Sequence, residues 1–175
     1  MSRQLALDLK LRDASSFDNF FAARNREAVQ SVEAAMAAAA DPAAGKLTVV
    51  FLWGEPGSGK THLLEAACRA AQAGGLSPVY ISMAEARVLP VDLLEGMEQA
   101  VLVTLDDVQC IAGDPAWEAA IFGLYERLRA HGGVLLVAAH ANPAHLGLRL
   151  PDLATRLGAD LVYQLHLLGD DDKVT

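Results

Sequence analysis

One short stretch constrains this chain more than any other. An apolar run over residues 47–53 leads into a glycine-rich segment, and a helical pattern begins at Lys60. The series Gly54-x4-Gly59-Lys60-Thr61 has the spacing of a phosphate-binding loop. Glycines let backbone N–H groups turn inward around phosphate oxygens, and the following helix directs its positive end at the same anion. The sequence therefore predicts a phosphate site between a buried strand and a helix.

The residues of this loop have expected roles. Lys60 would reach the β- and γ-phosphates of a nucleotide, and the Thr61 hydroxyl would ligate Mg²⁺. The expected nucleotide-binding residues are Gly54, Glu55, Pro56, Gly57, Ser58, Gly59, Lys60, Thr61, His62 and Asp106. A glycine-rich turn that merely caps a helix is the alternative interpretation. A dinucleotide fingerprint starting at Gly57 is excluded, because His62 stands where its third glycine would be.

A second apolar run ends in two carboxylates. Residues 100–105 have the composition of a buried parallel strand, and Asp106 and Asp107 follow directly. Ligands of parallel sheets bind beyond the carboxyl ends of the strands. We therefore expect Asp106 to hold Mg²⁺ through its bound waters, beside Thr61, and Asp107 to act as a catalytic residue that orients the attacking water. An acidic turn after a core strand is the alternative.

Strands and helices alternate along the remainder of the chain. Further strands are expected over about 78–82, 134–139 and 160–167, and helices over about 24–40, 60–73, 91–99, 114–131 and 150–157. This alternation predicts an α/β fold of P-loop NTPase type, with a five-stranded parallel sheet sandwiched by helices. We divide the chain into an extended peptide (1–13) and one nucleotide-binding domain (14–175).

Composition limits the partners and the compartment. The net charge is −8, which argues against a large DNA-contacting surface, so we expect little direct DNA binding. The sequence has neither an apolar run long enough to cross a bilayer nor a secretory signal, so we expect a cytoplasmic protein with no membrane association. Cys68 and Cys110 are far apart and outside any metal-binding pattern; we expect buried thiols in a reducing compartment.

The first residues alternate apolar and polar side chains. Leu5, Leu7 and Leu9 would share one face of an extended strand, which fits an edge strand packed on the domain. However, Gln4 opens the pattern, and residues 4–9 resemble the peptide by which bacterial replication proteins bind the sliding clamp. In that mode a glutamine and spaced leucines fill pockets on the clamp. The resemblance implies that Gln4, Leu5, Leu7 and Leu9 contact the clamp.

The order of the motifs resembles that of the AAA+ ATPases, and within them the DnaA initiator branch. A phosphate-binding loop, paired carboxylates, a strand ending in a polar residue and an arginine on the next short helix follow one another. Segments similar to the DnaA branch are 17–20, 59–64 and 105–109. The match is closer to the Hda-type regulators over 110–114, 117–125 and 150–157, and in the terminal glutamine–leucine peptide. The resemblance covers nearly the whole chain.

This resemblance implies a negative regulator of chromosomal replication initiation. Hda-like proteins, tethered to the DNA-loaded clamp, promote hydrolysis of the ATP held by DnaA. The implied partners are the sliding clamp (beta subunit) and DnaA, the implied cofactors are ATP or ADP with Mg²⁺, and the implied location is the bacterial cytoplasm, nucleoid-associated through the clamp. Arg156 would be an arginine finger acting on a neighbour's γ-phosphate, with a solvated helix arginine as the alternative. Whether the chain also forms a homo-oligomer is left open by the sequence.

Three features depart from the family pattern. His140 follows the fourth strand, where AAA+ proteins place a γ-phosphate sensor and DnaA-like proteins usually have aspartate; a catalytic sensor and a structural histidine are both open. Asp107 is one methylene shorter than the usual AAA+ glutamate, as in the DnaA branch. The chain ends near the point where the family's helical lid begins, so we expect a core without a lid and slow intrinsic hydrolysis. Residues 17–20 would line the nucleotide pocket or simply pack.

Two other functions stay open. One is a clamp-tethered nucleotide-binding module with no catalytic role. The other is a DnaC-like helicase-loader ATPase, which we expect to need a lid and a basic DNA-contacting surface. Whether the chain turns over ATP itself is open; we expect it to act mainly as the activator of a partner's ATPase.

Overall fold

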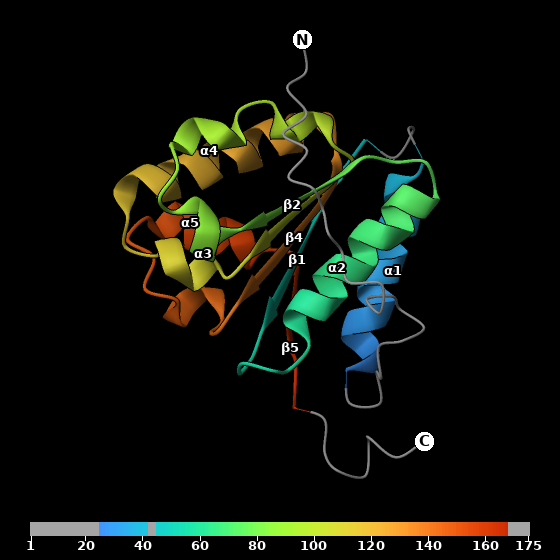
Figure 1. The fold of residues 1–175 in the computed structure, drawn as a ribbon, viewed down its shortest axis with the longest axis horizontal. Helices are drawn as coiled ribbons and strands as arrows, with labels where there is room; N and C mark the ends of the chain where they lie inside the picture. Colours follow the sequence, from blue (N-terminus) through green and yellow to red (C-terminus); the bar gives the residue numbers. More distant parts are fainter. Residues whose placement is uncertain (1–24, 42–44, 168–175) are drawn as a thin grey trace.

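The computed structural model describes residues 25–41 and 45–167, drawn as a coloured ribbon in Figure 1. The helices are α1 (Arg26–Ala39), α2 (Lys60–Ala73), α3 (Met83–Ala86), α4 (Pro115–His131) and α5 (Pro151–Leu157). The strands are β1 (Leu47–Trp53), β2 (Pro78–Ser82), β3 (Leu102–Asp106), β4 (Gly133–Ala139) and β5 (Leu161–Gln164). Short 3₁₀ helices are η1 (Val91–Leu94), η2 (Met97–Gln99), η3 (Val108–Ile111) and η4 (Pro143–His145). The predicted clamp peptide and residues 17–20 lie outside the described residues.

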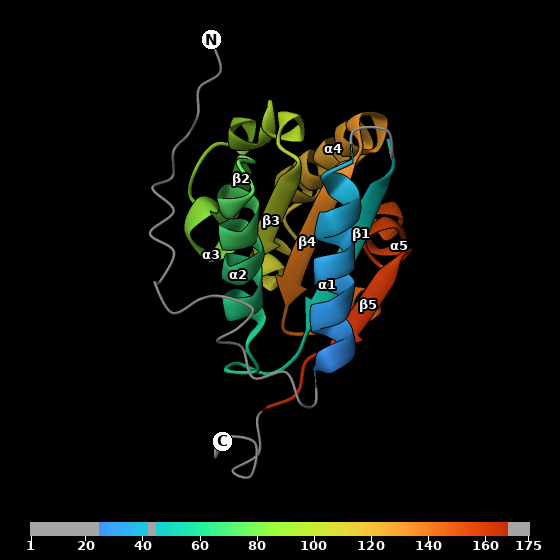
Figure 2. The ribbon, with the colours of Figure 1, turned by 90° about the vertical axis from the view of Figure 1, so that its right-hand side faces the viewer.

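The strands form one parallel sheet in the order β2-β3-β4-β1-β5. Helices α1 and α2 cover one face, and α3, α4 and α5 cover the other (Figures 1 and 2). The predicted five-stranded parallel sheet sandwiched by helices is confirmed, and the described residues contain no helical lid. Because every strand runs the same way, the carboxyl ends of β1, β3 and β4 meet at one edge of the sheet, where ligands of such folds bind.

Side chains of β1 alternate between two apolar cores. Val49 and Phe51 belong to the cluster under α4 and α5, whereas Val50 and Leu52 belong to the cluster under α1 and α2. Helices on both faces bury both sides of the strand, which explains why its sequence is continuously apolar. The sheet is therefore a rigid base for the loops at its edge.

The structure corrects two details of the predicted elements. The helix expected over 91–99 is two short 3₁₀ helices, η1 and η2, separated at Gly96, which has a left-handed backbone (φ 82°). The last strand was expected over 160–167 but ends at Gln164. The amide of Leu165 still donates to Trp53 O at 2.7 Å, so the chain stays beside β1 as it leaves the sheet.

The two cysteines differ in environment. Cys68 on α2 is buried, as predicted, and burial raises the pKa of its thiol to about 12. Cys110 is only partly buried, because it lies on η3 at the surface of the larger core, so the prediction of a buried thiol there is wrong. Among the described helices, none has both the length and the apolar character that a membrane span requires.

Candidate nucleotide-binding site

The phosphate-binding loop (residues 54–61) leaves the carboxyl end of β1 through a position that only glycine fits. A Cβ on Gly54 would collide with the backbone carbonyl of Leu165. At the other end of the loop, Gly59 precedes the first helical residue of α2 with φ 99°, in the left-handed region. Glycine adopts that region without steric cost, so the helix begins abruptly and its free amides face the loop.

The side chain of Lys60 is folded back over this loop. Its Nζ donates to the backbone oxygens of Gly54 and Glu55, at 2.6 and 2.9 Å, and lies 3.3 Å from Ser58 Oγ. Burial lowers the pKa of the Lys60 ammonium, while the carboxylates of Asp106 and Asp107 act in the opposite direction. The cation is thus held by the loop itself, where an anion would meet it.

Asp106 is the last residue of β3, and only 1% of it is exposed. Its Oδ2 accepts from Thr61 Oγ1 at 2.6 Å and from the Tyr80 hydroxyl at 2.7 Å, and its Oδ1 accepts from the amide of Asp107 at 3.0 Å. Burial raises the pKa of the Asp106 carboxyl, and the two hydroxyl donors partly offset that increase. The fold therefore brings the two predicted metal ligands, Thr61 and Asp106, into direct contact.

Tyr80 was not predicted as a site residue. It lies on β2, which pairs with β3 in a register that sets Ser82 beside Asp106. Burial, together with the nearby Asp106 carboxylate, raises the pKa of Tyr80, so its hydroxyl stays protonated and donates. The available signal in the sequence was a tyrosine in a core strand, since a buried tyrosine hydroxyl usually finds a partner.

Asp107 has an unusual backbone. Among the described residues it alone, apart from glycines, lies in the left-handed region (φ 55°, ψ 45°). Its Oδ1 accepts from Gln109 Nε2 at 3.2 Å, and Gln109 Oε1 accepts from the amide of His140 at 3.3 Å. Such a backbone costs on the order of 1 kcal/mol and is typical of functional sites. Gln109, which sequence reasoning missed, thus joins the end of β3 to the end of β4.

The oxygen donors fit a magnesium ion. Mg²⁺ prefers a few protein oxygens together with phosphate oxygens and water. Thr61 Oγ1 and Asp106 Oδ2 are 2.6 Å apart, so both can face one ion beside the phosphate-binding loop. Across the described part of the chain, no group of three or more His, Cys, Asp or Glu side chains forms a separate metal site. The Thr61–Asp106 pair is therefore the candidate position.

The remaining predicted residues fall into two groups. Glu55, Pro56 and Gly57 are exposed on the loop, Ser58 is buried beneath it, His62 is half-buried on the first turn of α2, and His140 is exposed after β4. Arg156 is separate: it is exposed on α5, which covers the opposite face of the sheet from α2 (Figure 1). Within the described residues its side chain has no hydrogen bond or ion pair.

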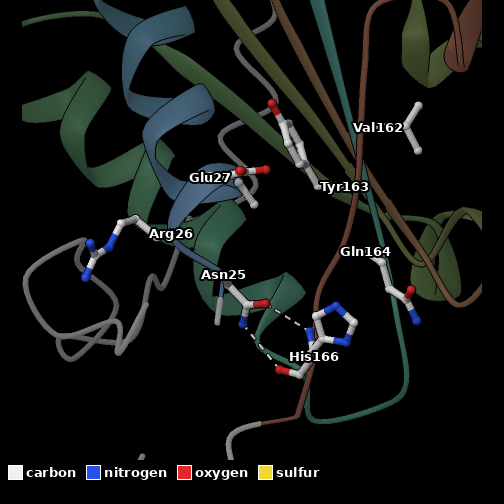
Figure 3. Close-up of a pocket in the computed structure, with 8 residues that line it drawn as sticks. Asn25, Arg26, Glu27, Val162, Tyr163, Gln164 and His166 are labelled. Carbon is white, nitrogen blue, oxygen red and sulfur yellow. Dashed lines mark hydrogen bonds between the residues drawn. The ribbon is translucent and has the colours of Figure 1, made fainter. Parts of the chain in front are cut away.

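A pocket of about 630 Å³ lies between the start of α1 and β5 (Figure 3). At its base Asn25, which is 3% exposed, holds the backbone of His166 through both ends of its carboxamide. Nδ2 donates to His166 O at 3.2 Å, and Oδ1 accepts from His166 N at 2.9 Å. Since Leu165 also contacts Gly54, the pocket adjoins the phosphate-binding loop. In the sequence, the only indication of this pocket is a polar residue, Asn25, directly before α1.

The strand order, the loop after β1 and the carboxylates after β3 define a nucleotide-binding domain of the AAA+ class. A family model described as the bacterial DnaA ATPase domain matches residues 11–164, which is most of the chain. The chain belongs to that family.

Solved structures agree with this assignment. AMPPCP-bound DnaA from Aquifex aeolicus has 25% identity and a TM-score of 0.75, covering 94% of this chain and 53% of that one. The replication initiator DnaA bound to AMPPCP and single-stranded DNA has 26% identity and a TM-score of 0.76, covering 90% and 51%. DnaI, at 16% identity and a TM-score of 0.68, covers 93% and 91% and shares the fold. The chain thus spans about half the length of the DnaA structures it matches.

Proposed function

We propose that this chain is an Hda-type regulator of replication initiation. It binds a nucleotide, attaches to the sliding clamp and promotes hydrolysis of the ATP held by DnaA. The observation that carries the proposal is the pairing of a complete phosphate-binding loop with an exposed arginine on a firmly packed helix. The first feature serves the chain's own nucleotide, and the second is available to a neighbour's.

The proposed nucleotide site consists of the phosphate-binding loop and the carboxyl ends of β1 and β3. Loop amides and Lys60 hold the phosphates of ATP or ADP, and Thr61 with Asp106 would hold Mg²⁺, which neutralises phosphate charge. Asp107, kept in place by Gln109, orients a water molecule, and His140 at the end of β4 lies on the same edge of the sheet. Support comes from the DnaA relatives, two of which are bound to AMPPCP.

Arg156 acts on a partner's ATP. Helix α5 is anchored by Leu153 and Leu157, both fully buried, while Arg156 projects from its exposed side. A guanidinium carries a permanent charge and a planar set of donors, which suits the developing charge on a γ-phosphate. Supplied in trans, such a group accelerates hydrolysis by about 10³- to 10⁵-fold.

Attachment to the clamp rests on the terminal peptide. Gln4, Leu5, Leu7 and Leu9 lie outside the described residues, and their role follows from the sequence pattern alone. The net charge of −8 supports little direct contact with DNA, although a DnaA relative is bound to single-stranded DNA. The protein would thus reach the nucleoid of a bacterial cytoplasm through the clamp.

Single-turnover hydrolysis of ATP bound in advance to DnaA tests the proposal. The chain is added with and without clamp loaded on DNA, in parallel with Arg156→Ala and with Arg149→Ala, which removes another exposed arginine just before α5. Clamp-dependent acceleration should be lost in Arg156→Ala and retained in Arg149→Ala. If the wild-type chain binds the clamp but gives no acceleration, the protein is a tethered module without a catalytic role. DNA binding and helicase loading would instead indicate the loader function.

A further inference from the structure

The hydroxyl of Tyr80 reaches the candidate metal site from a part of the fold that the phosphate-binding loop does not include. Tyr80 lies on β2, where it pairs with Thr104 of β3 and packs on the apolar cluster under α1 and α2. From there its oxygen comes within 2.7 Å of Asp106 Oδ2. The contact joins an edge strand of the sheet to a side chain at the end of the neighbouring strand.

The donors around Asp106 differ in what holds them. Thr61 lies on the first turn of α2 and would itself contact Mg²⁺, so its hydroxyl is not a donor independent of the metal. The amide of Asp107 belongs to the turn that follows β3. Tyr80 is fixed by the sheet and by its packed ring, and among the described residues its hydroxyl is hydrogen-bonded to Asp106 alone. It is therefore the donor that ties the carboxylate to the rigid scaffold.

We propose that Tyr80 is a positioning residue for Mg²⁺, which it serves by fixing the orientation of the Asp106 carboxylate. This inference rests on the proposed nucleotide site. Partners that hydrogen-bond to metal ligands set the ligand's orientation, and removing one typically weakens metal binding by about 10- to 100-fold. A purely structural hydroxyl, satisfied by the nearest acceptor, would instead contribute to stability and leave metal affinity unchanged.

The chain offers a matched control. Tyr163 on β5 is half-buried, and its hydroxyl is 2.6 Å from Ser31 Oγ on α1. Strands β2 and β5 are the opposite edges of the sheet. Tyr80→Phe and Tyr163→Phe therefore each remove one hydrogen-bonded hydroxyl group. Tyr80→Phe does so at the candidate metal site, and Tyr163→Phe does so at the opposite edge of the sheet.

The test measures Mn²⁺ binding to the chain–ADP complex by electron paramagnetic resonance, Mg²⁺ by competition, and ADP binding in EDTA by calorimetry. Tyr80→Phe should weaken metal binding about 10-fold while leaving metal-free ADP binding unchanged, and Tyr163→Phe should leave metal binding unchanged. Thermal unfolding of both variants reports the structural contribution separately. Unchanged metal affinity in Tyr80→Phe, or an equal loss of metal and metal-free ADP binding, overturns the positioning role. A wild-type chain that binds no ADP overturns the nucleotide site and this inference with it.

Discussion

Lys60 and Arg156 are the two cationic side chains that the sequence predicted to act on phosphates. Their environments in the structure are opposite. The ammonium of Lys60 is bonded to two backbone carbonyls of its own loop. Arg156 is exposed, and within the described residues its side chain has no bonding partner. The first region is organised by contacts within the chain, whereas the second is open to solvent. One domain thus combines a self-contained binding site with an outward-facing group.

The support beneath the two cations differs as well. The phosphate-binding loop is shaped by backbone geometry at its glycines, while α5 is held by a buried side chain of α4. Glu118 is 1% exposed, and its two oxygens accept from the amides of Gly113 and Leu150, each at 2.8 Å. Leu150 directly precedes α5, so Glu118 fixes the start of the helix that carries Arg156.

The largest expected effect is on the self-contained region. Lys60→Ala removes the only ammonium that reaches the loop carbonyls in the described part of the chain, and the lost charge-assisted contacts should weaken ADP binding by on the order of 100-fold. Calorimetry measures this, with Lys46→Ala, an exposed lysine before β1, as the control. Similar affinities for the two variants would remove Lys60 from the site.

Glu118→Ala should separate the two regions. It leaves two half-buried amides without their acceptors, which costs on the order of 2 kcal/mol of unfolding free energy, measured with urea. Stimulation of DnaA-bound ATP hydrolysis should fall, because the residue before α5 loses its hydrogen bond to Glu118, while ADP affinity stays unchanged. Glu126→Ala, at an exposed position on α4, is the control and should change stability by less than about 0.5 kcal/mol. Loss of ADP binding in Glu118→Ala would show that the regions are coupled.

The pH dependence of ADP binding should follow the protonation of Lys60. Burial lowers the pKa of Lys60, so this side chain loses its proton at a lower pH than an ordinary lysine. ADP affinity in EDTA should therefore decline as the pH rises through that lowered pKa, at a lower pH than an ordinary lysine would lose its charge. Lys60→Arg should give a flat profile, because a guanidinium stays charged as the pH rises through the pKa of a lysine. A flat profile for the wild-type chain would contradict the prediction.

The smallest expected effect is on the outward-facing group. Because Arg156 is exposed and unbonded to the described residues, Arg156→Ala should change the unfolding free energy by less than about 0.5 kcal/mol and leave ADP affinity unaltered. Urea unfolding and calorimetry on the variant measure both. A loss of more than about 1 kcal/mol would mean that the arginine has an internal partner, and that its role is structural.

Much of the fold was predictable because its signals are local. The bounds of α2 and β2 agree with the prediction, since glycines and a proline mark their ends and each interior has the apolar pattern expected of its element. The contact between Thr61 and Asp106 was predictable as well, because phosphate chemistry requires both at one edge of a parallel sheet.

The unpredicted parts depend on register and on long-range contacts. Tyr80 meets Asp106 across 26 positions, and only the pairing of β2 with β3 decides which strand residue lies within reach. Asn25 meets His166 across 141 positions, which no local pattern encodes. The left-handed backbone of Asp107 was not predicted either, because aspartate adopts this region in only a minority of positions and no local pattern marks this one.

The carboxamide of Asn25 gives the domain a mechanical property. This side chain hydrogen-bonds to both the N–H and the C=O of His166, as a neighbouring strand would (Figure 3). These two bonds join the two ends of the described chain. A pulling force applied at those ends would act first on these two hydrogen bonds. The force would next reach the bond from Leu165 to Trp53, and only then the start of the phosphate-binding loop at Gly54. Tension applied at the two ends of the described chain would therefore be borne at the edge of the candidate site before it could deform the phosphate-binding loop.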